Sequence, residues 1–81
     1  MFYTYILQSD KNKDIYIGST EDINKRLATH NAGKVRSTKA YRPWKLLEYR
    51  TFFSRSEAVQ EERHLKNHQQ KEIIKEKYRA Q

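Results

Sequence analysis

The sequence predicts an α+β domain in which a small three-stranded, mainly antiparallel sheet is flanked by helices. Three observations lead to this prediction. Aromatic and β-branched residues open the chain, apolar residues at helical spacing begin at residue 23, and a second strand-then-helix pattern fills the second half. A chain of 81 residues supports one modest core, so we expect a single domain spanning 1–81.

The first two strands are expected to form a hairpin. The first covers 2–7, with Tyr5 on the same face as Tyr3 and Leu7, and the second covers Ile15 to Gly18. The polar residues between them are rich in turn formers, which favours a short connection. Antiparallel pairing is expected to make Tyr5 and Tyr16 cross-strand neighbours.

A helix is expected directly after the hairpin, from Ile23 to about Asn31. Ile23 and Leu27, four residues apart, give it a buried stripe. Thr20 is placed to cap the start of this helix, and Gly33 suits its end.

The second half of the chain begins with an irregular basic segment at 34–44. The third strand is expected at 45–53, and a second helix opens at Ser54 or Ser56. A third, shorter or frayed, helix is expected around residues 73–78.

Composition and charge favour a polyanionic partner. Seventeen Lys and Arg against ten acids give a net charge of +7, which is typical of proteins that bind nucleic acid. The absence of cysteine excludes disulfides and thiolate metal sites. The apolar start of the chain is too short for a signal peptide or a membrane span, so we expect a cytoplasmic protein without membrane contact.

Two features of the predicted helices have two interpretations each, a chemical role or an ordinary solvated surface. Arg26 and His30 are spaced i, i+4, so they project from one side of the first helix. Glu62 falls on the same stripe as Ala58 and Leu65, where a carboxylate either leans out to solvent or is kept charged by a cation or metal. In each case the alternative is an ordinary polar helix surface.

Taken together, five residues supply the parts that phosphodiester cleavage needs. Tyr5 and Tyr16 are suited to activating a water molecule, and Arg26 presents a permanently charged planar fork to phosphate oxygens. His30 is able to take or give a proton near neutral pH. Glu62, with several waters, is a usual way to hold Mg²⁺.

The same residues resemble the motifs of the GIY-YIG nuclease family over almost the whole chain. The resemblance is to its small stand-alone bacterial members and to the nuclease domain of the bacterial excision-repair enzymes. The matching segments are Phe2–Leu7, Tyr16–Thr20, Asp22–Asn31 and Ser56–Lys66.

The resemblance implies a metal-dependent endonuclease with a role in repair or restriction and with DNA as the expected substrate. It implies that Tyr5 and Tyr16 assist the nucleophile, that Arg26 clamps the phosphate and that His30 handles protons. It further implies that Glu62, rather than the neighbouring Glu61, binds a single Mg²⁺ or Mn²⁺.

Two positions depart from the family pattern. Thr4 stands where the first motif has a glycine, and threonine suits a strand. Ser19 stands where the excision-repair enzymes have a lysine, so one group that stabilises charge is missing. Lys25 and Lys39 are the candidates to replace it.

The basic segment is the expected substrate-binding edge. The nucleic-acid contacts are assigned to Lys25, Arg36, Lys39 and Arg42. The aromatic Trp44 is either a stacking platform for bases or, as we favour, part of the core. His64 and His68 have the spacing of a zinc pair but no third ligand nearby, so a zinc site is not expected.

Two other classes of function are compatible with these features. The first is a nucleic-acid-binding module that keeps the nuclease fold and cleaves poorly or not at all. The second is a structural protein that uses its basic faces to dock on an acidic protein. For a nuclease of this size, sequence-specific targeting is expected to need a protein partner or a dimer.

Overall fold

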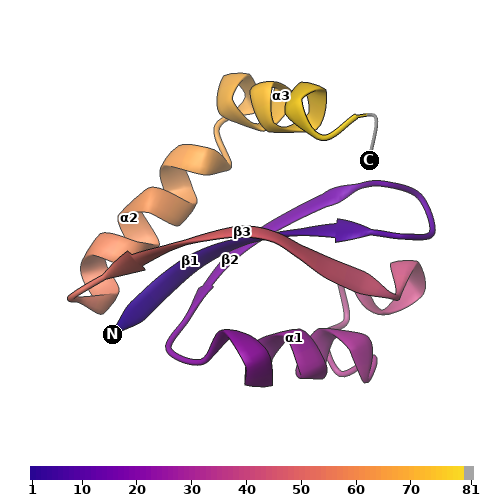
Figure 1. Cartoon of the computed structure of the whole chain (residues 1–81), viewed down its shortest axis with the longest axis horizontal. Coiled ribbons are helices and arrows are strands. Elements are labelled where there is room, and N and C mark those ends of the chain that lie inside the picture. The colour runs from indigo at the N-terminus through magenta and orange to yellow at the C-terminus, as the bar shows by residue number, and fades with distance from the viewer. Residues whose placement is uncertain (80–81) are drawn as a thin grey trace.

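A three-stranded antiparallel sheet is the centre of the structure, a computed structural model that describes residues 1–79 (Figure 1). The strands are β1 (Phe2–Ser9), β2 (Ile15–Thr20) and β3 (Trp44–Phe52), in the order β2–β1–β3. Both pairings are antiparallel, with a register shift between Ile6 and Leu7 in the pairing of β1 with β3. The predicted fold class is confirmed, although the last two residues of the predicted 1–81 domain lie outside the described residues.

Helices cover both faces of the sheet and make three layers. In Figure 1, α1 (Ile23–Asn31) lies below the sheet, and α2 (Arg55–Leu65) and α3 (His68–Lys77) lie above it. A short 3-10 helix, η1 (Lys39–Tyr41), interrupts the basic segment. Within the described part of the chain, α2 is the longest helix at eleven residues, and no helix has the length and apolar run needed to cross a membrane.

Each sheet face has its own core, because the side chains of β1 alternate between the two faces. On the α1 face, Tyr5 and Leu7 pack with Trp44, and Leu27 of α1 closes this cluster. Trp44 is therefore a core residue, as favoured from the sequence. The cluster on the other face joins the sheet to α2 and α3, and its buried members are Ile6, Ile15, Ile17, Leu65 and Ile74.

The capping of α1 differs from the prediction. Asp22, not Thr20, is the N-cap, and its side chain accepts a hydrogen bond from the Lys25 amide at 3.0 Å. The reason is that β2 continues to Thr20, which still pairs with Tyr3 in the sheet. Gly33 follows the helix with φ of +76°, the left-handed conformation that glycine adopts at little cost.

The second half follows the predicted order with different bounds. Ser54 is the N-cap of α2 and forms a reciprocal capping box with Glu57. The third helix has ten residues, one fewer than α2 and one more than α1, and it begins at His68, before the predicted 73–78. Its inner side is held by buried Ile74 and by an ion pair between Lys77 and Glu48 of β3.

Candidate active site

Tyr5 and Tyr16 lie on the α1 face of the sheet as diagonal neighbours. Tyr5 pairs with Gly18 and Tyr16 pairs with Leu7, so the two tyrosines are cross-strand neighbours, as expected, but on the diagonal. Their ring centroids are still 6.4 Å apart. Gly18 leaves room for the phenol of Tyr5, because a Cβ at that position would lie 2.5 Å from the phenolic oxygen. The glycine thus lets the Tyr5 side chain reach the outer edge of β2.

The first helix brings Arg26 and His30 to this edge. His30 is fully buried, and its Nε2 lies 3.1 Å from the hydroxyl of Tyr5. The imidazole also packs edge-on against Tyr16, with ring centroids 4.8 Å apart. Arg26 is half-buried, and its guanidinium is close enough to Tyr5 to oppose the rise in the pKa of that phenol. Tyr5, Tyr16 and His30 are therefore in mutual contact, and Arg26 lies near Tyr5.

The environment keeps both buried groups uncharged near neutral pH. Burial raises the pKa of Tyr5 above 10.0, against an opposing effect of hydrogen bonding with Arg26. Burial, and then the positive charge of Arg26, lowers the pKa of His30 below 6.5. A neutral imidazole beside a protonated phenol is the arrangement that permits proton transfer from Tyr5 to His30.

Glu62 approaches the same edge of β2 from the other face of the sheet. Successive side chains of a strand point to opposite faces, so Ser19 faces α2 while Gly18 faces α1. The Ser19 hydroxyl donates to Glu62 Oε1 at 2.7 Å. Burial is the main cause of the raised pKa of Tyr5, and the negative charge of Glu62 adds to it. Because β2 has no strand on its outer side, groups from both faces meet at its edge.

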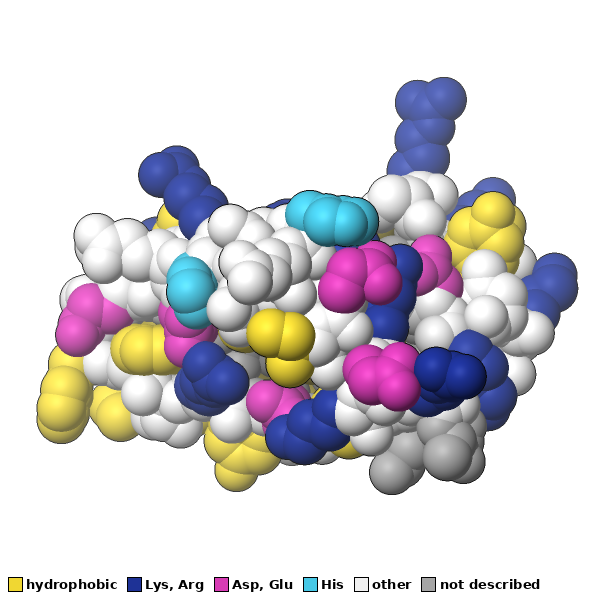
Figure 2. Space-filling model, turned by 90° about the horizontal axis from the view of Figure 1, so that it is seen from above, with side chains coloured by type: hydrophobic (Ala, Val, Ile, Leu, Met, Phe, Trp, Pro, Cys, Tyr) yellow, Lys and Arg dark blue, Asp and Glu magenta, His cyan; other side chains and the backbone are white. Residues whose placement is uncertain are grey.

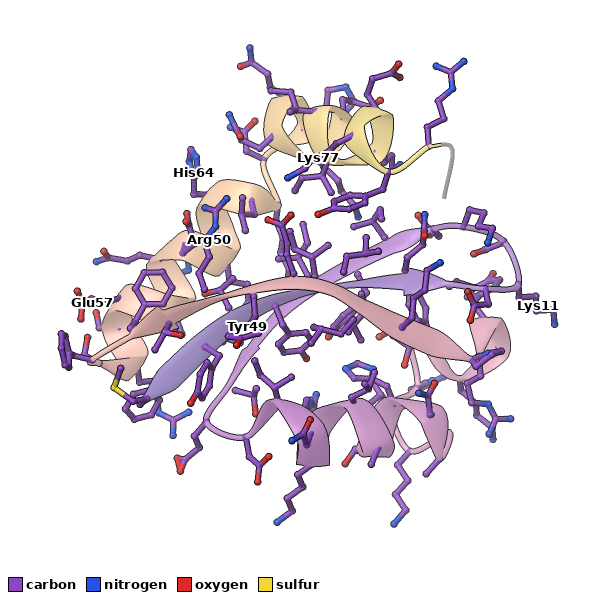
Figure 3. The ribbon with its side chains drawn as sticks, viewed as in Figure 1. Lys11, Tyr49, Arg50, Glu57, His64 and Lys77 are labelled. Carbon is purple, nitrogen blue, oxygen red and sulfur yellow. The ribbon has the colours of Figure 1, made fainter. Side chains whose placement is uncertain are left out.

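The second oxygen of Glu62 is held by a cation from its own helix. Lys66 Nζ lies 2.7 Å from Glu62 Oε2, an i, i+4 pair. Burial alone would raise the pKa of Glu62, but hydrogen bonds from Lys66 and Ser19 outweigh it and the pKa is lowered. Glu61 turns elsewhere and pairs with Arg50, which points from β3 toward α2 (Figure 3). Of the two glutamates, only Glu62 is hydrogen-bonded to β2.

The donor set at Glu62 fits a hydrated divalent cation. One carboxylate that is ionised at neutral pH, with a hydroxyl beside it, is the kind of partial oxygen site that Mg²⁺ occupies while keeping several waters. Among residues 1–79 there is no cluster of three or more His, Asp and Glu side chains of the kind that forms a complete metal site. His64 and His68 are both exposed, and Figure 3 shows His64 pointing away from the sheet.

The four cations of the predicted binding set have no acidic partner among residues 1–79. In the described structure no ion pair involves Lys25, Arg36, Lys39 or Arg42, although Arg42 also donates to the Lys39 carbonyl at 2.9 Å. Lys25 lines a surface hollow beside α1 together with Arg26. On the face covered by α2 and α3, by contrast, basic and acidic side chains are interspersed (Figure 2). These four cations therefore place unpaired positive charge near α1 and the basic segment.

Two contributors to this site were missed in the sequence. Lys66 places an ammonium beside Glu62, and its spacing of four residues from Glu62 was the available signal. Thr4 also has a larger role than expected. Its buried hydroxyl donates to the Ala58 carbonyl at 2.6 Å and fastens α2, the helix that carries Glu62, to the central strand.

Comparison with known proteins agrees with this arrangement. Residues 1–79 match the family described as the GIY-YIG catalytic domain. The chain belongs to the GIY-YIG family. The family is one of nuclease catalytic domains, and GIY-YIG nucleases generally use divalent metals.

Small bacterial GIY-YIG proteins are among the chain's relatives. It is 38% identical over 74 residues to the UPF0213 protein SH2523 of Staphylococcus haemolyticus, covering 90% of this chain and 89% of that protein. It is 46% identical over 59 residues to the UPF0213 protein YsiG of Lactococcus lactis, covering 72% of this chain and only 56% of that protein. The solution NMR structure of the UPF0213 protein BH0048 from Bacillus halodurans matches with a TM-score of 0.55 and 29% identity, covering 96% of this chain and 86% of that one.

Proposed function

We propose that this chain is a metal-dependent endonuclease that hydrolyses phosphodiester bonds, with DNA as the substrate and a role in repair or restriction. One observation carries the proposal: two tyrosines, an arginine and a histidine from one face of the sheet meet the edge of β2 that Glu62 reaches from the other face. Each of these groups supplies a different requirement of phosphoryl transfer, and family membership supports the same conclusion.

Arg26 and Tyr16, the accessible groups, are assigned to contacts with the substrate and the attacking water. Arg26 and Tyr16 are half-buried and open to solvent, so a scissile phosphate meets them first. The guanidinium of Arg26 donates to the phosphate oxygens and stabilises the charge that builds on them in the transition state. The hydroxyl of Tyr16 orients the attacking water by hydrogen bonding.

Tyr5 and His30, the buried pair, are assigned to proton transfer. As water attacks phosphorus, its proton passes to the phenolic oxygen of Tyr5 while the Tyr5 proton passes to His30 Nε2, 3.1 Å away. His30 then carries the extra proton and Tyr5 is unchanged. The nearby charge of Arg26 disfavours imidazolium, which favours release of this proton when the leaving oxygen departs.

Glu62 is assigned to a single Mg²⁺ or Mn²⁺. When bound, the divalent cation neutralises charge on the phosphate and the leaving oxygen. Ser19 fixes the orientation of the carboxylate by donating to Oε1. Lys66 has to release Oε2 if both carboxylate oxygens are to face the metal.

The contacts of the basic segment are assigned to the nucleic-acid backbone. Lys25, Arg36, Lys39 and Arg42 are exposed and have no acidic partner among the described residues, so phosphates compete with no internal carboxylate for them. These contacts carry no base identity, which fits an enzyme that recognises the backbone rather than a sequence.

A nucleic-acid-binding module with little cleavage is the alternative, and one observation favours it. Both oxygens of Glu62 are already satisfied by Ser19 and Lys66, so the pocket is electrostatically complete as it stands. In that case Arg26 and the basic segment still bind phosphate, and the carboxylate serves only to hold Lys66.

A cleavage panel separates the two. Labelled single-stranded, duplex, flap and branched DNAs and RNAs are incubated with wild type and with Arg26→Ala, in Mg²⁺, Mn²⁺ or EDTA. A nuclease gives products in metal and none in EDTA, and Arg26→Ala loses about 2 kcal/mol or more of transition-state stabilisation. Salt-sensitive binding without products in any metal would instead establish the binding module.

A further inference from the structure

Thr38 lies on the far side of His30 from Tyr5. It is 1% exposed, and its Oγ1 is 2.9 Å from His30 Nδ1. The imidazole therefore has one hydrogen-bond partner on each nitrogen, Tyr5 at Nε2 and Thr38 at Nδ1. A neutral imidazole carries a proton on only one of its nitrogens, so these two partners decide which one.

The other hydrogen-bond partner of Thr38 determines the direction of its hydrogen bond with His30. Thr38 Oγ1 also lies 3.4 Å from the Val35 carbonyl, which only accepts, so the Thr38 proton goes to Val35. With the Thr38 proton directed at Val35, Nδ1 carries the ring proton and donates to Thr38, and Nε2 accepts from Tyr5.

The backbone around Thr38 holds this geometry in place. The Thr38 amide donates to the Val35 carbonyl at 3.1 Å, which makes a turn. The Thr38 carbonyl accepts the indole N–H of Trp44 at 2.9 Å. Because Trp44 is buried in the core of the α1 face, Thr38 is anchored to the same cluster as Tyr5.

We propose that Thr38 is a positioning residue that holds His30 in the Nδ1–H tautomer and so keeps Nε2 ready to receive the proton of Tyr5. The tautomer follows from the contacts alone, whereas its use in cleavage rests on the proposed function. With the opposite tautomer, Nε2–H would point at Tyr5 and His30 would have no lone pair for that proton.

The tautomer is measured by nitrogen NMR of the three histidines in labelled protein. His64→Gln and His68→Gln assign the other two rings, which are exposed. In wild type we expect protonated Nδ1 and unprotonated Nε2 in His30. Thr38→Val removes the acceptor at nearly constant shape and is expected to give a mixture of tautomers, while Thr38→Ser keeps the hydroxyl and the wild-type pattern. An Nε2–H tautomer in wild type, or an unchanged pattern in Thr38→Val, overturns the proposal.

Two further measurements keep the result interpretable. Should Thr38→Val fail to fold, Trp44→Phe retains an aromatic ring but loses the hydrogen bond to Thr38, and it is expected to shift the tautomer populations in the same direction. In the cleavage assay, Thr38→Val is expected to lose about tenfold in rate, part of the contribution of a positioned acid–base group. Thr38→Ser should recover it, and the exposed neighbour variant Ser37→Ala should match wild type. A protein that cleaves nothing but shows the Nδ1–H tautomer would refute the proposed function and leave Thr38's positioning role intact.

Discussion

The phenol of Tyr5 crosses directly over Gly18, with Cζ 2.7 Å and the oxygen 2.5 Å from where a side-chain Cβ would stand. The glycine of the second motif is therefore required by the tyrosine of the first. A side chain at position 18 would keep the Tyr5 hydroxyl from reaching His30, whose Nε2 lies 3.1 Å from it. The segments that contain Tyr5 and Gly18 therefore form one structural unit across the β1–β2 pair. The length of the hairpin sets their separation in the sequence.

Gly18→Ala is accordingly expected to displace Tyr5 and to destabilise the fold. Overpacking by one methyl group typically costs about 1–3 kcal/mol, measured as a fall in the free energy of unfolding in urea. In a Tyr5→Leu background the same substitution should cost clearly less, because the clashing ring is gone. Equal costs in both backgrounds would show that Tyr5 is not what excludes a side chain at Gly18.

The buried imidazole makes stability depend on pH. Burial and then the charge of Arg26 lower the pKa of His30 below 6.5, so below that pH the unfolded chain binds more protons than the folded one. The free energy of unfolding is therefore expected to fall as pH drops from about 7.5 to about 5.5, above the range where carboxylates titrate. His30→Gln should flatten this slope, and His64→Gln, at an exposed position, should leave it unchanged. A slope that persists in His30→Gln would assign it to another group.

Lys66 is expected to compete with a divalent cation for Glu62. Its ammonium lies 2.7 Å from Oε2, and about half of its side chain is exposed. Pairs of this kind are worth up to about 1 kcal/mol, so Lys66→Met should tighten Mn²⁺ binding by about two- to fivefold. Mn²⁺ titration followed by electron paramagnetic resonance measures this without any substrate, with Lys75→Met on α3 as control. Unchanged or weaker Mn²⁺ binding in Lys66→Met would show that the lysine does not compete.

The basic segment is expected to set the salt dependence of nucleic-acid binding. Removing one phosphate contact lowers the slope of log K against log salt by about 0.9 for duplex DNA and about 0.7 for single strands. Arg36→Ala and Lys39→Ala should each lower the slope by roughly this amount. Lys77→Ala removes a cation that already pairs with Glu48, so it should leave the slope nearly unchanged. Equal effects at all three positions would indicate a diffuse charge effect instead of a defined surface.

The sequence was enough to predict what depends on local pattern and motif order. The strands and the first helix follow from periodicity and family resemblance. The choice of Glu62 over Glu61 as metal ligand stays a prediction, although Glu62 is the one hydrogen-bonded to β2. The pairing register was out of reach, because the hairpin loop leaves open whether Tyr16 stands opposite Tyr5 or Leu7. The N-cap of α1 was misplaced because the sequence pattern ends β2 at Gly18, whereas the strand runs on to Thr20.

Thr38 shows a different limit. Its contact with His30 depends on the turn from Val35 and on the hydrogen bond from the Trp44 indole. Neither produces a periodic pattern in the sequence of an irregular segment. Lys66, in contrast, stands four residues from Glu62 on one helix, where an ion pair is the default expectation. Contacts along a regular element are predictable from spacing, and contacts between an irregular segment and a helix are not.

The central claim, that Glu62 makes this site a metal-dependent nuclease, is tested most directly by a matched pair of neighbouring variants. Glu62→Gln and Glu61→Gln remove the same charge from adjacent positions, and single-turnover cleavage in Mn²⁺ is measured with protein in excess, alongside binding in EDTA. The account predicts that Glu62→Gln binds the substrate but does not cleave it, while Glu61→Gln cleaves as wild type does. Cleavage by Glu62→Gln at the rate of wild type would contradict it.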